Sequence, residues 1–66
     1  MNIKEYGEAV SKIHNPKALS LWVFYKNKYR PLKKEYILKN LPDMSEIELD
    51  ECVAYLDKLN FKIKIL

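Results

Sequence analysis

The sequence predicts a mainly α-helical fold, a small helix-turn-helix (winged-helix-like) domain with one C-terminal β-strand. Apolar residues recur at helical spacing in four stretches, each bounded by residues that cap or break helices. Two of these stretches, 33–40 and 45–59, are separated by a tight corner, as in a helix-turn-helix. With 66 residues, of which 48% are hydrophobic, the chain is one folded domain spanning residues 1–66.

Residues 1–14 are predicted to form an N-terminal amphipathic helix. Its apolar face follows alternating steps of three and four: Ile3, Tyr6, Val10 and Ile13. Asn2 is the expected cap, with Glu5 in the capping-box position, and Gly7 weakens the helix by roughly 1 kcal/mol. The first interpretation is that this face docks on its own domain. Because the spacing also fits a coiled-coil seam, a partner helix is the alternative.

The second predicted helix begins at Pro16 and ends near Lys28. Asn15 suits the N-cap, and Pro16 suits the first helical position, where the missing N–H costs nothing. Its apolar residues cover most of the circumference: Ala18, Leu19, Leu21, Trp22, Val23, Phe24 and Tyr25. We therefore expect the central helix of a small core, with Trp22 and Phe24 packed against two different neighbours.

A third helix over 33–40 ends where Pro42 disfavours helical geometry at Leu41. Its apolar side comprises Tyr36, Ile37, Leu38 and Leu41. Asp43 is a turn former, and the side chain of Met44 is predicted to be buried in the core at this turn.

The fourth helix, 45–59, begins with Ser45 as cap and Glu48 at the capping-box position. Its apolar stripe has 3.6-residue spacing: Leu49, Cys52, Val53, Leu56 and Leu59. Cys52 lies on that stripe, so it is interpreted as an inert small hydrophobic residue. Asn60 is suited to the left-handed conformation that ends a helix.

The C-terminal segment 61–65 alternates apolar and basic residues, which predicts a half-buried strand with Lys62 and Lys64 facing outward. After Ile65 only Leu66 remains. The open edge of this strand is expected to pair with an earlier segment of the chain, with a second copy or with a partner.

In this order of elements, residues 16–65 resemble a winged-helix domain, a helix-turn-helix followed by a β-hairpin. The pattern consists of Ile37, Leu38, Leu41, Met44, Ser45, Leu49, Val53, Leu56 and Leu59. The exit Leu59-Asn60-Phe61-Lys62-Ile63 is similar to the family's Leu-Gly-Phe-x-Ile, with Asn60 where Gly is usual. The resemblance implies DNA binding and a recognition helix over 45–59, with the wing truncated to one strand.

Charge is divided unevenly along the chain, whose net charge is +3. Residues 1–42 hold nine basic and three acidic groups, and residues 43–66 hold three basic and six acidic groups. The candidate nucleic-acid-binding residues, hereafter the basic segment, are Lys26, Lys28, Arg30, Lys33, Lys34 and Lys39. They are interpreted either as phosphate contacts or as solvated lysines that complement a helix dipole.

The expected recognition helix is acidic. The candidate partner-binding residues are Glu46, Glu48, Asp50, Glu51 and Asp57, against which the helix has only Lys58. Carboxylates are repelled by phosphates, and base edges are read mostly by Arg, Lys, Asn and Gln. An acidic face would instead suit a basic protein surface.

Two functions therefore remain open. One is a small non-enzymatic DNA-binding regulator, or a replication or transcription accessory protein, whose selectivity comes from a dimer or from DNA shape. The other is a protein-protein interaction module, an adaptor or inhibitor, that uses the acidic helix and the open strand edge. A homodimer is expected in addition, because the core is small and the 1–14 face is free to pair.

Enzymatic, metal-binding and cofactor-binding roles are not expected. His14 is isolated, Ser45 serves as a cap, and Gly7 is the only glycine, so no phosphate-binding loop exists. One Cys, the absence of a long apolar run and a start unlike a signal peptide predict a cytoplasmic protein without a membrane segment. The small size and the frequent Lys, Asn, Ile and Tyr suggest a viral or mobile-element source.

Overall fold

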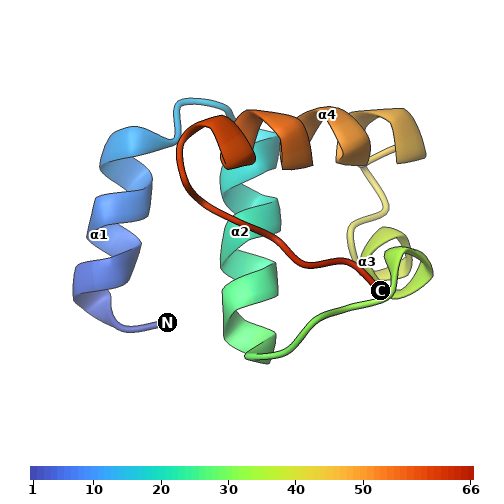
Figure 1. Ribbon diagram of the computed structural model, residues 1–66, viewed down its shortest axis with the longest axis horizontal. Helices are drawn as coiled ribbons and strands as arrows, with labels where there is room; N and C mark the ends of the chain where they lie inside the picture. The colour runs from blue at the N-terminus through green and yellow to red at the C-terminus, as the bar shows by residue number, and fades with distance from the viewer.

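The computed structural model describes residues 1–66 as four helices joined by short segments (Figure 1). The helices are α1 (Ile3–Lys12), α2 (Pro16–Lys28), α3 (Lys34–Asn40) and α4 (Glu46–Lys58). The predicted mainly helical class is confirmed, and each expected helix is present with ends within two residues of the prediction. None of the four combines the length and the apolar character that crossing a membrane requires.

Three of the four helix starts are capped by the residues expected to cap them, whereas α3 begins after Lys33 without a side-chain cap. The Asn2 side chain accepts a hydrogen bond from the backbone N–H of Glu5 at 2.8 Å, and Asn15 accepts from two backbone amides of α2. At the start of α4 the Glu48 N–H donates to Ser45 Oγ at 3.2 Å, and the Ser45 N–H donates to Glu48 Oε1 at 3.0 Å. The capping box is therefore complete.

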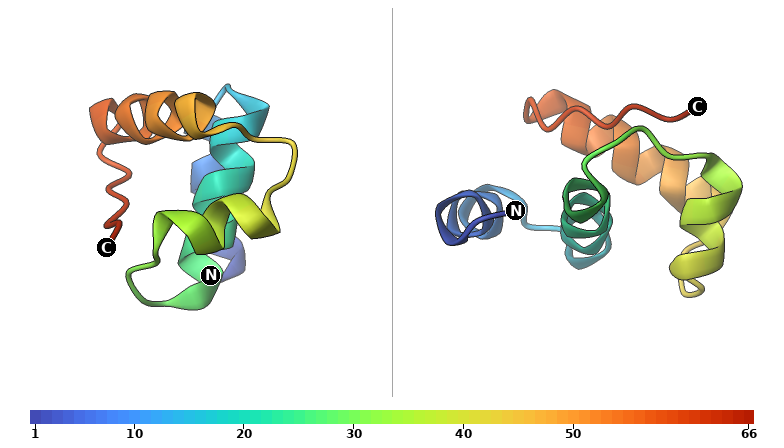
Figure 2. Two further views of the ribbon diagram at one scale, coloured as in Figure 1. Left: turned by 90° about the vertical axis from the view of Figure 1, so that its right-hand side faces the viewer. Right: turned by 90° about the horizontal axis from the view of Figure 1, so that it is seen from below.

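Helix α2 is the centre of the molecule. The view from below shows α1 and α3 on opposite sides of α2, with α4 crossing over α2 and α3 (Figure 2). Trp22 packs edge-on against Phe61 of the C-terminal segment, with ring centroids 5.0 Å apart, and Phe24 lies 6.0 Å from Tyr36 of α3. These contacts confirm that the aromatic residues of α2 serve two different neighbours.

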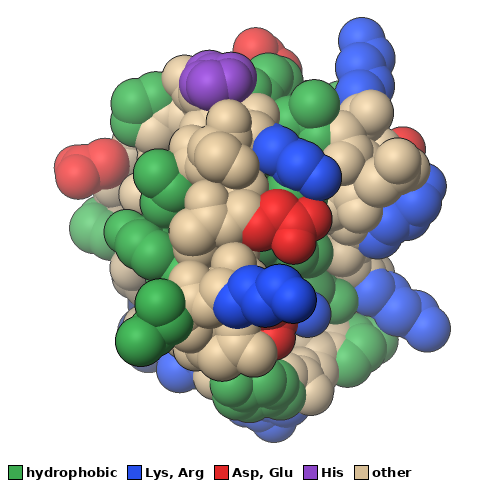
Figure 3. Space-filling model, turned by 90° about the vertical axis from the view of Figure 1, so that its left-hand side faces the viewer, with side chains coloured by type: hydrophobic (Ala, Val, Ile, Leu, Met, Phe, Trp, Pro, Cys, Tyr) green, Lys and Arg blue, Asp and Glu red, His purple; other side chains and the backbone are tan.

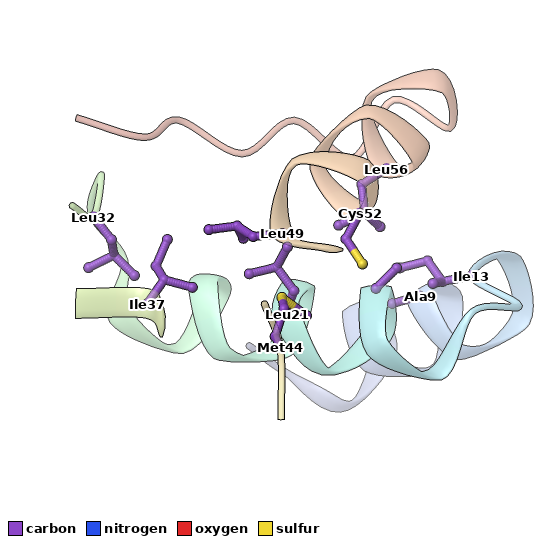
Figure 4. Close-up of a cluster of buried hydrophobic side chains, with 10 residues drawn as sticks. Ala9, Ile13, Leu21, Leu32, Ile37, Met44, Leu49, Cys52 and Leu56 are labelled. Atoms are coloured by element: carbon purple, nitrogen blue, oxygen red, sulfur yellow. The ribbon is translucent and has the colours of Figure 1, made fainter. Parts of the chain in front are cut away.

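The core draws on all four helices and on the three segments that connect them (Figure 4). Its buried members are Ala9, Ile13, Ala18, Leu21, Leu32, Ile37, Met44, Leu49, Cys52 and Leu56. Met44 and Cys52 are buried as predicted. Because α4 contributes three of these residues, it is a core helix first, and only its outer side is free for other contacts.

The docking predicted for the apolar face of α1 is wrong for most of that face. Only Ile13 is buried, whereas Ile3, Tyr6 and Val10 are exposed. The line that faces the rest of the domain runs through Ala9 and Ile13, four residues apart, and is rotated away from the expected stripe. The sequence pattern missed this line because Ala9, which is fully buried, is small and weakly hydrophobic.

The strand expected over 61–65 does not form. The segment makes a single parallel bridge between Leu32 and Ile65: the Leu32 N–H donates to the Lys64 carbonyl at 3.4 Å, and the Leu66 N–H donates to the Leu32 carbonyl at 2.9 Å. The pairing stops there because the two residues that would extend it, Arg30 and Lys34, lie in the bend after α2 and in α3. The alternation itself is confirmed, since the apolar residues of 61–65 are half-buried and the lysines exposed. Asn60 has the expected positive φ of 67°.

Candidate nucleic-acid interface

The basic segment begins on the last turn of α2 and continues through the connection to α3. Helix α2 ends at Tyr29, a non-glycine residue in the left-handed conformation with φ of 55°. This turn directs Arg30 and Pro31 away from the helix axis and leaves the Tyr29 side chain exposed. Sequence reasoning missed this turn, because Gly or Asn is the usual residue at such an end.

Two lysines of α2 lie on aromatic rings of the domain. Lys26 Nζ is 5.5 Å from the centre of the Trp22 ring. Lys28 Nζ is 5.3 Å from the Phe24 ring centre and 5.7 Å from that of Tyr36. A ring face attracts an ammonium group without neutralising it, so these contacts orient the lysines and leave their charge available.

Arg30 lies between two shallow hollows at the end of α2. One, of about 290 Å³, is lined by Tyr25, Lys26, Tyr29, Arg30 and Pro31. The other, of about 210 Å³, is lined by Arg30, Pro31, Leu32, Lys33, Tyr36 and Leu66. Neither hollow has an acidic residue, and Arg30 and Lys33 are exposed and form no ion pair within the chain.

The remaining two members of the basic segment differ from each other. Lys39 is exposed and unpaired near the end of α3, roughly 9 Å along the helix from Lys33. Lys34 is bound between two carboxylates of α4, with Nζ 3.0 Å from Glu46 Oε1 and 2.9 Å from Asp50 Oδ1. The hydrogen bond to Asp50, followed by that to Glu46, raises the pKa of Lys34. Its charge is therefore already compensated.

Other acidic residues of α4 are also held by cations of the same chain. Lys17 of α2 forms an ion pair with Glu48, and its Nζ also donates to the Asp43 carbonyl at 3.3 Å. The hydrogen bond from Lys17, followed by that from the Ser45 backbone, lowers the pKa of Glu48 from its ordinary 4.5 to about 2. Lys62 Nζ lies 2.9 Å from Asp57 Oδ1.

The outward strip of α4 is consequently close to neutral. Of the five acidic residues predicted to bind a partner, only Glu51 lacks an ion pair. Steps of four, three and four residues place Ile47, Glu51, Ala54 and Lys58 on one exposed face. This strip carries one acid and one base, and its largest apolar side chain, Ile47, is 71% exposed.

His14 and Cys52, the other residues with reactive side chains, belong to the framework of the fold. The His14 backbone N–H donates to Tyr55 Oη at 3.0 Å, which ties the connection after α1 to α4. Cys52 is buried in the core, and this burial raises the pKa of its thiol. No three His, Cys, Asp or Glu side chains gather in a way that could hold a metal ion.

Comparison of the chain with protein-family models, with curated proteins and with solved structures found no match.

Proposed function

We propose that this chain is a small DNA-binding domain of helix-turn-helix, winged-helix-like type, acting as a regulator or as a replication or transcription accessory protein. Five cations would contact duplex phosphates: Lys26, Lys28, Arg30, Lys33 and Lys39. The observation that carries the proposal is that none of the five has an acidic partner in the chain. Lys34 is left out because it bridges α3 to α4.

The ion pairs leave free positive charge at the end of α2 and in the connection to α3, with Lys39 further along α3. Of the twelve basic residues, four (Lys12, Lys17, Lys34 and Lys62) form ion pairs, which leaves eight free. Five of those eight belong to the basic segment. Unpaired cations can release phosphate counterions without first breaking an internal contact, so this end is suited to a nucleic-acid backbone.

Helix α4 has little capacity to read bases. Its outward strip of Ile47, Glu51, Ala54 and Lys58 lacks the Arg, Asn and Gln residues that make most contacts to base edges. We therefore propose phosphate-dominated binding, with any selectivity derived from DNA shape or from the spacing of two copies.

A salt series of duplex binding, followed by fluorescence anisotropy, tests the proposal. With five phosphate contacts the logarithm of the binding constant should fall with the logarithm of salt concentration with a slope of about −4.5. Lys33→Glu should weaken binding and reduce the slope by about 1. Lys58→Glu is the matched control, since Lys58 is also exposed and unpaired but lies at the end of α4 away from the basic segment (Figure 1). Absence of binding to any duplex at the lowest salt would overturn the proposal.

The alternative, a protein-interaction module, retains one favourable feature, the exposed Ile47 beside the unpaired Glu51. The other acidic residues of α4 are less suitable for a partner, because docking would have to compete with Lys17, Lys34 and Lys62. Glu51→Lys is therefore the cleanest probe, as it breaks no internal ion pair. Loss of a specific partner in a pull-down with this variant, with the fold intact, would favour the alternative.

A further inference from the structure

Tyr29, at the end of α2, is the most exposed aromatic residue of the chain. It is 77% exposed, whereas Tyr6 is 49% and Tyr36 36% exposed, and the other five aromatic residues are partly buried. The Tyr29 ring takes part in none of the aromatic or cation–π contacts of the domain. The faces of this ring are therefore available to another molecule.

The fold itself does not require a tyrosine at this position. Tyr29 has φ of 55°, a conformation that strains a residue with a Cβ atom and that Gly or Asn adopts more easily. Its side chain adds little packing in return, since it is exposed. The hydroxyl accepts a hydrogen bond from the amino group of Met1, which engages the rim of the ring and not its faces. A strained residue that contributes little to packing points to a functional role.

The surroundings of the Tyr29 ring carry positive charge. Lys26 and Arg30 line, together with Tyr29, the hollow of about 290 Å³ at the end of α2. Neither cation forms an ion pair within the chain. Tyr25, which also lines the hollow, is held in place because the Lys64 backbone N–H donates to its Oη at 3.2 Å. An exposed ring, a fixed wall and uncompensated positive charge thus meet at one hollow.

This combination suits a single nucleic-acid strand better than a duplex. The cations attract the phosphates of either form. In a duplex the faces of the bases are covered by neighbouring base pairs, so a ring beside the backbone finds no base face. A single strand exposes its base faces, and aromatic side chains next to positive charge stack on them.

We propose that Tyr29 stacks on an unpaired base of single-stranded DNA, while Lys26 and Arg30 contact the phosphates on either side of that base. The inference rests on the proposed function, because both cations belong to the basic segment. It adds a contact that a duplex cannot make, so the domain should bind a single strand through bases as well as through charge.

The exposed tyrosine of α1 lacks these surroundings. Tyr6 shares its helix with two acidic and two basic residues: Lys4, Glu5, Glu8 and Lys12. Figure 3 shows the molecule from the side of α1, with acidic and basic side chains interspersed on this face. A surface of mixed charge does not concentrate phosphates, so Tyr6 is the control for an exposed tyrosine outside the basic segment.

Binding of oligothymidylate and of a duplex, each followed by fluorescence anisotropy, tests the inference. Tyr29→Asn removes the ring and supplies a residue that accepts the left-handed conformation, so the melting temperature should not fall. Binding to oligothymidylate should weaken by about tenfold or more, with the affinity for the duplex unchanged. Tyr29→Phe, which keeps the ring and lacks the hydroxyl, should bind both as the wild type does, and so should Tyr6→Ala.

An abasic strand separates stacking from charge. It has the phosphates of oligothymidylate without the bases, so the wild type should bind it about tenfold or more weakly than oligothymidylate. Tyr29→Asn should bind the abasic strand as the wild type does. The salt slope for oligothymidylate should be the same in Tyr29→Asn and the wild type, because stacking releases no counterions, whereas Lys33→Glu should reduce it by about 0.7.

The outcomes distinguish this inference from the proposed function. If Tyr29→Asn binds oligothymidylate as the wild type does, or loses as much affinity for the duplex or the abasic strand, stacking at Tyr29 is wrong and duplex binding by the basic segment stands. Ring-dependent binding of oligothymidylate without any duplex binding would support stacking and overturn the proposed duplex binding. Absence of binding to both would overturn both.

Discussion

Helix α4 and the basic segment have opposite charge in the sequence. They also differ in whether their charged side chains form ion pairs within the chain. Four of the five acidic residues predicted as a partner site on α4 are bound by lysines of the same chain. Five of the six cations of the basic segment have no acidic partner. The count of charged residues therefore exaggerates the acidity of α4 and describes the basic segment well.

The difference follows from position in the fold. Other elements flank α4, so a long lysine side chain from α2, from α3 or from the C-terminal segment reaches each paired carboxylate. The end of α2 and the connection to α3 lie at the edge of the molecule (Figure 1). Lys26 and Lys28 there lie on aromatic rings, and Lys33 has no ion pair.

The largest expected effect tests whether α4 is primarily a core helix. Leu49→Ala removes a fully buried side chain and should destabilise the fold by about 2–5 kcal/mol, whereas Ile47→Ala on the exposed side should change stability by less than about 0.5 kcal/mol. Urea unfolding monitored by circular dichroism measures both. Similar losses for the two variants would mean that α4 is covered on its outer side.

The next effect concerns the basic segment. Arg30→Glu combined with Lys33→Glu should weaken duplex binding by at least about a hundredfold at low salt and reduce the salt slope by about 2. The free energy of unfolding should change by less than about 0.5 kcal/mol, because neither side chain is paired. An equal loss of binding in the Lys58→Glu control would show that total charge, and not this segment, determines affinity.

Adjacent lysines provide a sharper comparison. Lys34→Gln should lower the melting temperature, because it frees Glu46 and Asp50 of their shared cation, and should leave the salt slope of duplex binding nearly unchanged. Lys33→Gln should do the reverse, with an unchanged melting temperature and a slope reduced by about 1. If both variants behave alike, ion pairing does not distinguish the two lysines.

The smallest effect is expected from acid titration of Glu48. Its pKa is lowered to about 2 in the folded chain, from an ordinary value of 4.5. Glu48 therefore contributes stability that is fully present above pH 4.5 and is lost as the pH falls toward 2. Melting temperatures measured across this range should fall more steeply for the wild type than for Glu48→Gln. Parallel curves would show that the Lys17 pair contributes nothing measurable.

Local signals in the sequence predicted most of the helical framework. Asn2, Asn15 and Ser45 mark the helix starts through side chains that bond neighbouring backbone amides, and Asn60 marks an end. These interactions span at most a few residues, so they can be read from the sequence alone.

Features that depend on distant segments were not predictable in the same way. The burial of Ala9 depends on how α1 is rotated against α2, and the single bridge at Ile65 depends on the short connection around Leu32. Lys34 resembles Lys33 in the sequence but differs in its partners, because only one of them reaches α4. The sequence therefore predicted which residues make up the candidate site. It did not predict which of their charges are free and which are held in ion pairs.

Lysine labelling with and without duplex DNA, read by mass spectrometry, tests the central claim residue by residue. In the free protein Lys17 and Lys34, whose pKa values are raised by their carboxylate partners, should react more slowly than Lys33 and Lys58. Duplex DNA should then protect Lys26, Lys28, Lys33 and Lys39 while Lys58 remains reactive. Protection of Lys58 to the same degree, or no protection of the basic segment, would contradict the claim that this segment holds the available charge.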